Sequence, residues 1–112
     1  MSEANLKSKI WVQALIRQCD VNGASAMVVY KGDEDAGAVL VKINTLGQGC
    51  MVLSQVRTGE GQKAWMRATG EDWVDEAVAD AYIERQRTYD EDLWVIEIED
   101  REGRHPLADK IL

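Results

Sequence analysis

The sequence predicts an α+β fold of the α/β sandwich type, with two helices packed on a single mixed, mainly antiparallel sheet. Three observations lead to this class. Two segments repeat apolar residues at helical spacing, five short segments have the composition of strands, and the connections between most strands are short and rich in Gly and acidic residues. The expected order is α-β-β-β-β-α-β with a short C-terminal hairpin tail, in a single domain over residues 1–112.

The first expected helix runs from about Asn5 to Asn22. Its apolar residues recur at steps of three and four, and Gly23 follows it, where the left-handed backbone that often ends a helix is easily adopted. The apolar face is expected to consist of Leu6, Ile10, Trp11, Ala14, Leu15 and Cys19.

Four strands are expected next. Residues 26–30 form an uninterrupted apolar run, which is typical of a strand buried on both faces. Residues 38–44 alternate, so that Val41 lies on the face opposite Lys42, and residues 50–57 and 63–68 are weaker repeats of this pattern. Because the connections between these strands are short, we expect antiparallel neighbours.

The second helix is expected from about Trp73 to Thr88, with Asp72 as its N-cap. A last strand over residues 93–99 follows it. A helix between the fourth and fifth strands permits a crossover, so the last strand can lie parallel to a neighbour. The apolar stripe of this helix is expected to consist of Val74, Val78, Ala81 and Tyr82.

Composition excludes several classes of function. A net charge of −7 and a pI near 4.6 argue against a general nucleic-acid binder, because phosphates are bound through Lys and Arg. One His and two distant cysteines, Cys19 and Cys50, predict no metal site, and no cofactor motif occurs. The sequence shows no signal peptide and no membrane span, so we expect a cytoplasmic protein with reduced, buried thiols and no membrane partner.

The segment DEDLWVIEIEDREGRH, from Asp90 to His105, holds most of the chain's candidate chemistry. If Gly103 turns the chain back on the last strand, a two-residue turn places His105 opposite Asp100, and a three-residue turn places it opposite Glu99. Either carboxylate favours the charged form of the histidine.

The charged turn around Gly103, called the corner below, has two interpretations. In one, it is a small enzyme or binding site for an anionic metabolite, since Arg forks and turn amides bind carboxylates and phosphates. In the other, it is a cross-strand salt bridge, because the acidic and basic residues alternate and can pair with one another. The residues of the candidate anion site are Arg101, Arg104 and His105, with Glu97 or Glu99.

A second candidate is a sheet face. If both helices cover one face, the other presents polar residues and one aromatic, a composition suited to a protein partner. We expect Trp65 at the surface, and Trp11 and Trp94 in the core. The candidate interaction face consists of Lys42, Gln55, Arg57, Trp65 and Arg67.

Three stretches carry a resemblance to a known family: IWVQALIR (Ile10–Arg17), GDEDAGAVLVKIN (Gly32–Asn44), and RQR with YDEDLWVIEIEDREGRH (within Arg85–His105). The chain resembles a family of small alphaproteobacterial proteins catalogued only as a domain of unknown function. The resemblance implies a single-domain, cytoplasmic bacterial protein with no assigned activity, so it transfers no catalytic or binding residue. Residues 48–70 match it least.

The sequence therefore supports two hypotheses about the function of the protein. The leading hypothesis is a non-enzymatic cytoplasmic interaction module that contacts another protein, or its own copy in a homodimer, through a sheet face or an edge strand. The alternative is the small enzyme or binding protein for an anionic metabolite at the Arg101, Arg104 and His105 corner.

Overall fold

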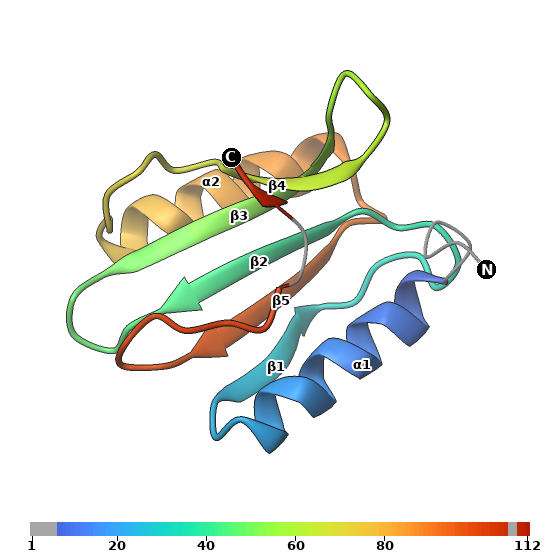
Figure 1. Cartoon of the computed structure of the whole chain (residues 1–112). Coiled ribbons are helices and arrows are strands. Elements are labelled where there is room, and N and C mark those ends of the chain that lie inside the picture. The colour runs from blue at the N-terminus through green and yellow to red at the C-terminus, as the bar shows by residue number, and fades with distance from the viewer. Residues whose placement is uncertain (1–6, 108–109) are drawn as a thin grey trace.

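The computed structural model describes residues 7–107 and 110–112, and it has the predicted α+β fold (Figure 1). Within that part of the chain, neither helix has the length and apolar character needed to cross a membrane. The elements, in order, are α1 (Ser8–Val21), β1 (Ser25–Tyr30), β2 (Val39–Asn44), β3 (Cys50–Arg57), β4 (Lys63–Arg67), α2 (Glu76–Tyr89), β5 (Trp94–Glu99) and the two-residue β6 (Lys110–Ile111).

The strands form one sheet in the order β1-β5-β2-β3-β4-β6. The last long strand, β5, lies parallel to β2, an arrangement that the helix before it permits, and β2, β3 and β4 form an antiparallel meander. The prediction that β1 and β2 are neighbours is wrong, because β5 lies between them and pairs antiparallel with β1. β1 is therefore left at an edge of the sheet.

The β1–β2 loop explains how a short connection can pass over an intervening strand. It runs across the start of β5, where the backbone N–H of Asp33 donates to the carbonyl of Asp92 (2.9 Å) and the indole Nε1 of Trp94 donates to the carbonyl of Asp33 (2.7 Å). A side chain at Gly32 would collide with the Asp92 carbonyl. The crossing thus depends on glycine for close backbone approach.

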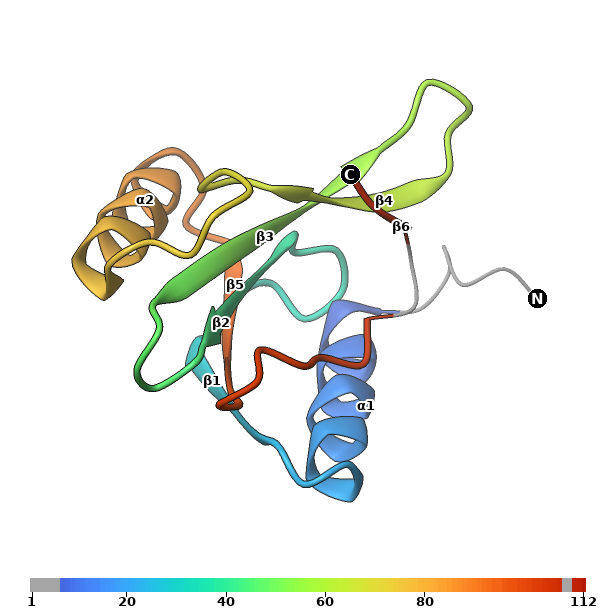
Figure 2. The same cartoon turned by 60° about the vertical axis from the view of Figure 1, so that its left-hand side comes forward.

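The two helices lie on opposite faces of the sheet, so the arrangement expected if both covered one face is wrong (Figure 2). The cause is that β2 and β5 are apolar on both faces: Val41 and Ile96 point to the α1 side, and Leu40 and Val95 to the α2 side. Each apolar face needs its own cover, which gives three layers.

Each helix also turns a somewhat different face to the sheet than predicted. In α1, Ile10 and Ala14 are exposed; in α2, Val78 and Ala81 are. Val74 pairs with Cys50 as an isolated bridge, so α2 begins later than predicted, with Asp75 rather than Asp72 before its first turn. Leu6 lies outside the described residues. The residues that the helices bury are Val12, Leu15 and Cys19 in α1, and Ala79 and Ile83 in α2.

The acidic loop after β1 closes the start of α1. The backbone N–H of Ser8 donates to the carbonyl of Asp35 (3.2 Å), and that of Lys9 donates to the carbonyl of Glu34 (2.9 Å). The Ser8 hydroxyl donates to the carbonyl of Gly37 (2.7 Å). The first N–H groups of a helix have no partner within it, so the loop carbonyls satisfy them.

The C-terminal hairpin is only half confirmed. Gly103 adopts a positive φ of 71° in a turn after β5, as expected. Residues 104–107 do not return along β5, because β1 and β2 already occupy both of its edges. The chain instead reaches β4, on which β6 pairs in parallel at the far edge of the sheet.

Candidate functional site

The residues of the predicted interaction face lie on both sides of the sheet, and some of them are buried. Gln55 pairs with Trp65, which places both on the α1 side of the sheet, whereas Lys42 pairs with Val52 on the α2 side. Trp65 is fully buried, with its ring centroid 5.7 Å from that of Trp11, so its expected place at the surface is wrong.

The C-terminal residues account for part of this burial. The N–H of Leu112 donates to the carbonyl of Trp65 (2.7 Å), and Arg67 donates to the carbonyl of Leu112 (3.2 Å). Arg57 is exposed and donates to the carbonyl of Gly61 (3.0 Å) in its own hairpin. The predicted face is therefore occupied by contacts within the chain.

Lys42 is buried beneath α2 and holds that helix to the sheet. Its Nζ lies 2.7 Å from Glu76, 2.8 Å from Asp80 and 3.5 Å from Glu97. Burial on its own lowers the pKa of Lys42, but the hydrogen bonds from Asp80 and Glu76 and the charge of Glu97 outweigh it, so the pKa is raised overall. The cluster is a set of satisfied ion pairs, which indicates a structural role.

The turn after β5 is organised by Asp100. Its buried carboxylate accepts hydrogen bonds from the N–H groups of Glu102 (3.0 Å) and Arg104 (2.9 Å), and from the Arg104 guanidinium at 3.2 and 3.0 Å. The side-chain bonds from Arg104 are the largest of the effects that lower the pKa of Asp100 to about 2. Arg104 is thus already paired with an anion within the chain.

His105 does not form either predicted carboxylate pair. Among the described residues, its hydrogen-bond partner is the backbone N–H of Leu107, which donates to Nδ1 at 3.4 Å. Burial lowers the pKa of the imidazole, which opposes the charged form that the sequence suggested. A cavity of about 270 Å³ adjoins His105, lined by Cys19, Asn22, Ala24, Asp100, Arg104 and Pro106.

The remaining members of the predicted anion site lie elsewhere. Glu97 and Glu99 alternate with the α1-facing Ile96 and Ile98, so they point to the α2 side, where Glu97 is engaged by Lys42. Arg101 is exposed in the turn. Burial raises the pKa of the Cys19 thiol, so this cysteine is an un-ionised core side chain rather than a nucleophile.

Within residues 7–107 and 110–112, no group of three or more His, Cys, Asp or Glu is arranged to hold a metal ion.

The surface that sequence reasoning missed is the outer edge of β1. This strand was expected to be buried on both faces, but Met27 is 45% exposed and Val28 and Val29 are each 40% exposed. No described strand pairs with the outer side of β1, so its outward backbone N–H and C=O groups take part in no described β-ladder. The ladder with β5 is irregular between Val28 and Tyr30, which marks a bulge at Val29.

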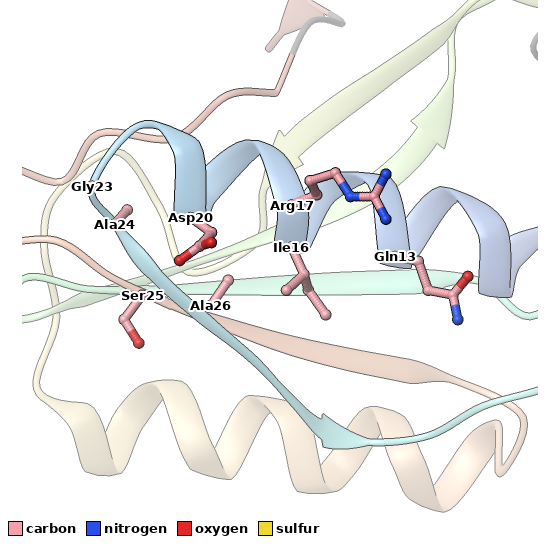
Figure 3. A pocket seen from close by; sticks show the side chains of 8 residues that line it. All are labelled: Gln13, Ile16, Arg17, Asp20, Gly23, Ala24, Ser25 and Ala26. Carbon is pink, nitrogen blue, oxygen red and sulfur yellow. The ribbon is translucent and has the colours of Figure 1, made fainter.

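A groove runs beside this edge, between β1 and α1 (Figure 3). Its volume is about 640 Å³. Ile16, Ala24 and Ala26 supply apolar lining, and polar side chains come from the exposed side of the helix. Its remaining lining residues are Gln13, Arg17, Asp20, Gly23 and Ser25.

One signal in the sequence points to this edge. Residues 94–98 are apolar on both faces through Trp94, Val95 and Ile96, and a strand of that kind belongs at the centre of a sheet. If β5 occupies the centre beside β2, it displaces β1 outward. The apolar run in β1 alone does not distinguish a buried strand from an exposed edge.

The chain is similar to proteins of one family. A family model described as "Protein of unknown function (DUF1491)" matches residues 6–108. A crystal structure of a DUF1491 family protein from Caulobacter crescentus CB15 is 42% identical, with a TM-score of 0.87, and the match covers 96% of this chain and 99% of that one. An NMR structure of a DUF1491 family protein from the same organism gives a TM-score of 0.84 at 42% identity, covering 96% and 97%.

A third similar structure is a solution structure of a protein from A. tumefaciens. It is 29% identical, with a TM-score of 0.73 and coverage of 95% of this chain and 97% of that one. Among curated proteins, none matches the chain.

Proposed function

We propose that this chain, which belongs to the DUF1491 family of proteins of unknown function, is an interaction module that binds a polypeptide partner along the edge strand β1. The observation that carries the proposal is the exposure of Met27, Val28 and Val29 on a strand whose outer edge no described strand covers. A second strand added there gains backbone hydrogen bonds and buries apolar side chains.

The composition of β1 supports this role. Proteins protect free sheet edges from unwanted pairing with Lys, Pro, short strands, bulges or covering loops. The six residues SAMVVY of β1 contain neither a charge nor a proline, and the bulge at Val29 is the only such device within the strand. An edge of this kind is suited to pairing with another strand.

We further propose that the module works in the cytoplasm and catalyses no reaction. The supporting observations are the free thiols of Cys19 and Cys50, which suit a reducing compartment, and the internal pairing of Lys42 and Arg104. The anionic-metabolite alternative is favoured by one observation, the cavity beside His105, but Asp100 neutralises its main cation.

Site-specific photo-crosslinking in the native cell tests the proposal. A photoreactive phenylalanine analogue replaces Met27, and in a matched control it replaces Met66, which is 44% exposed in β4, a strand paired on both sides. We expect crosslinked polypeptides, detected by mass spectrometry, from position 27 and not from position 66. Equal yields at both positions, or none at position 27, would refute the proposal.

A further inference from the structure

We infer that the partner at β1 is a second copy of this chain, related by a two-fold axis, so that the two β1 strands pair antiparallel and the two sheets become one. This inference rests on the proposed role of β1 as an interaction edge. The support for it is that one half of β1 lies beside the groove, whereas the other half exposes apolar side chains that suit such a groove.

The groove lies beside the first half of the strand, at Ser25 and Ala26, and the exposed valines lie in its second half, at Val28 and Val29. Antiparallel pairing brings the second half of one β1 beside the first half of the other. Each copy's valines then lie next to the other copy's groove, and both contacts form together. Self-complementarity of this kind is what a two-fold interface requires.

Side-chain direction agrees with this arrangement. Ala26 and Val28 pair with Ile98 and Ile96 of β5, which belong to the core on the α1 side of the sheet. In a continuous sheet this face is shared by both copies, because a two-fold axis perpendicular to the sheet preserves its faces. Val28 of one copy therefore points to the side on which the other copy's Ile16 lines the groove.

Charge complementarity along α1 favours a second copy over an unrelated strand. Asp20 lies over Ala26 in Figure 3, and a strand rises about 3.3 Å per residue against about 1.5 Å for a helix, so Met27 lies roughly level with the α1 residues between Arg17 and Asp20. A two-fold axis there sets the two α1 helices antiparallel, with Arg17 of each copy toward Asp20 of the other. Neither side chain makes an ion pair with any residue that the structure describes, so both are available.

The whole-chain charge of −7 acts against association, but it is not concentrated at the proposed seam. β1 is uncharged, and Arg17 and Asp20 cancel. Repulsion between the two copies is therefore long-range and screened by salt, so dimerisation should strengthen as ionic strength rises from about 0.01 M to about 0.15 M.

The experiment measures mass by sedimentation equilibrium for the wild-type chain and for charge variants. We expect the wild type to reach twice its 12.5 kDa mass. Arg17→Asp puts like charges on both sides of the seam, and so does Asp20→Arg, so each should weaken self-association about tenfold. Mixing the two variants should restore a dimer, because one copy then carries two acidic side chains and the other two basic ones.

A second pair of variants tests the strand itself. Val29→Lys places a charge on the edge and should abolish the dimer, whereas Val78→Lys, at a residue 51% exposed on α2, should leave it unchanged. Circular dichroism confirms that each variant is folded.

Three outcomes overturn the inference. A wild-type chain that stays monomeric up to about 1 mM has no such dimer. A dimer that persists in Val29→Lys and in both charge variants uses another surface. A monomeric wild type whose position 27 still crosslinks to a different protein refutes the homodimer while the proposed interaction role stands.

Discussion

The two edges of the sheet differ in whether other parts of the chain cover them. At one edge, β4 is covered by the chain's own C-terminal residues: β6 pairs with it, and Leu112 donates to the carbonyl of Trp65. At the other edge, β1 has no such cover among the described residues and exposes Met27, Val28 and Val29.

The contrast shows that an exposed edge is not imposed by this fold. After β5, Leu107 packs against the core on the α1 side of the sheet, and β6 pairs with β4, where Ile111 packs against the cluster that contains the fully buried Trp65 (Figure 2). The same chain therefore closes one edge and leaves the other open with apolar residues. Substitutions at either edge, or in the part of the chain between them, test this contrast.

The largest effect is expected at the closed edge. Trp65→Ala removes a fully buried indole and should lower the free energy of unfolding by about 3–5 kcal/mol, since the core cannot fill the whole space left behind. Urea denaturation followed by circular dichroism measures this. Trp73→Ala, at a partly exposed tryptophan, is the matched control and should cost clearly less; equal losses would mean that Trp65 is not a core anchor.

A smaller loss is expected in the centre of the sheet, which serves as the reference for both edges. Lys42→Met leaves three carboxylates without their cation and should cost about 1–3 kcal/mol, less than a wholly buried pair, because the side chains of Glu76 and Asp80 are each 55% exposed.

The pH dependence of this loss follows from the raised pKa of Lys42. The stabilisation is present below the unfolded-state pKa of about 10.4 and is lost as pH rises above it. The difference in stability between wild type and Lys42→Met should thus be constant from pH 7 to about pH 9 and shrink above about pH 10.4. Denaturation at several pH values measures it, and a difference that grows at high pH would contradict the assignment.

The turn that sends the chain toward the closed edge should respond to acid. Because the pKa of Asp100 is lowered to about 2, its contribution to stability is present at neutral pH and is lost as pH falls from about 4 through 2. Asp100→Asn should be less stable than wild type at pH 7, with the gap closing by pH 2. Asp72→Asn, at an exposed carboxylate, is the control; an Asp100→Asn gap that does not change with pH would refute the charge-based account.

The smallest effect on stability is expected at the open edge. Val29→Lys should change the free energy of unfolding by no more than about 0.5 kcal/mol at a protein concentration where the chain is monomeric, since the residue is 40% exposed. Chemical denaturation of dilute protein checks this. A loss of several kcal/mol would show that the β1 edge is part of the core, and the proposed difference between the two edges would be disproved.

Much of the fold could be predicted from local pattern. The limits of β1 to β5 agree with prediction to within about one residue, because Gly-rich turns and apolar alternation mark strand ends locally, whereas β6 was not predicted. The helix before β5 allowed its parallel pairing with a neighbour, which the structure shows to be β2. The neighbours of β1 could not be predicted in this way, since strand order depends on contacts distant in sequence.

The candidate site was harder to predict for the same reason. Trp65 and Lys42 lie in strands with polar neighbours, which suggested an open face. Leu107 and Ile111 pack against the core cluster that contains Trp65, and α2 covers Lys42, in both cases from positions far along the chain. Met27 and Val28 belong to an apolar run that suggested burial, yet no described strand pairs with the outer edge of β1. Residue type alone does not show which apolar strand lies at the margin of a sheet.

The bonds between Ser8 or Lys9 and the acidic loop have a consequence for association. They join the start of α1 to the residues just after β1, so helix, turn, strand and loop form a closed circuit from Ser8 to Gly37. An exposed strand tethered at only one end would lose conformational entropy when it docks. Here both ends are fixed beforehand, so the edge is preorganised and little of the binding free energy is lost to ordering it.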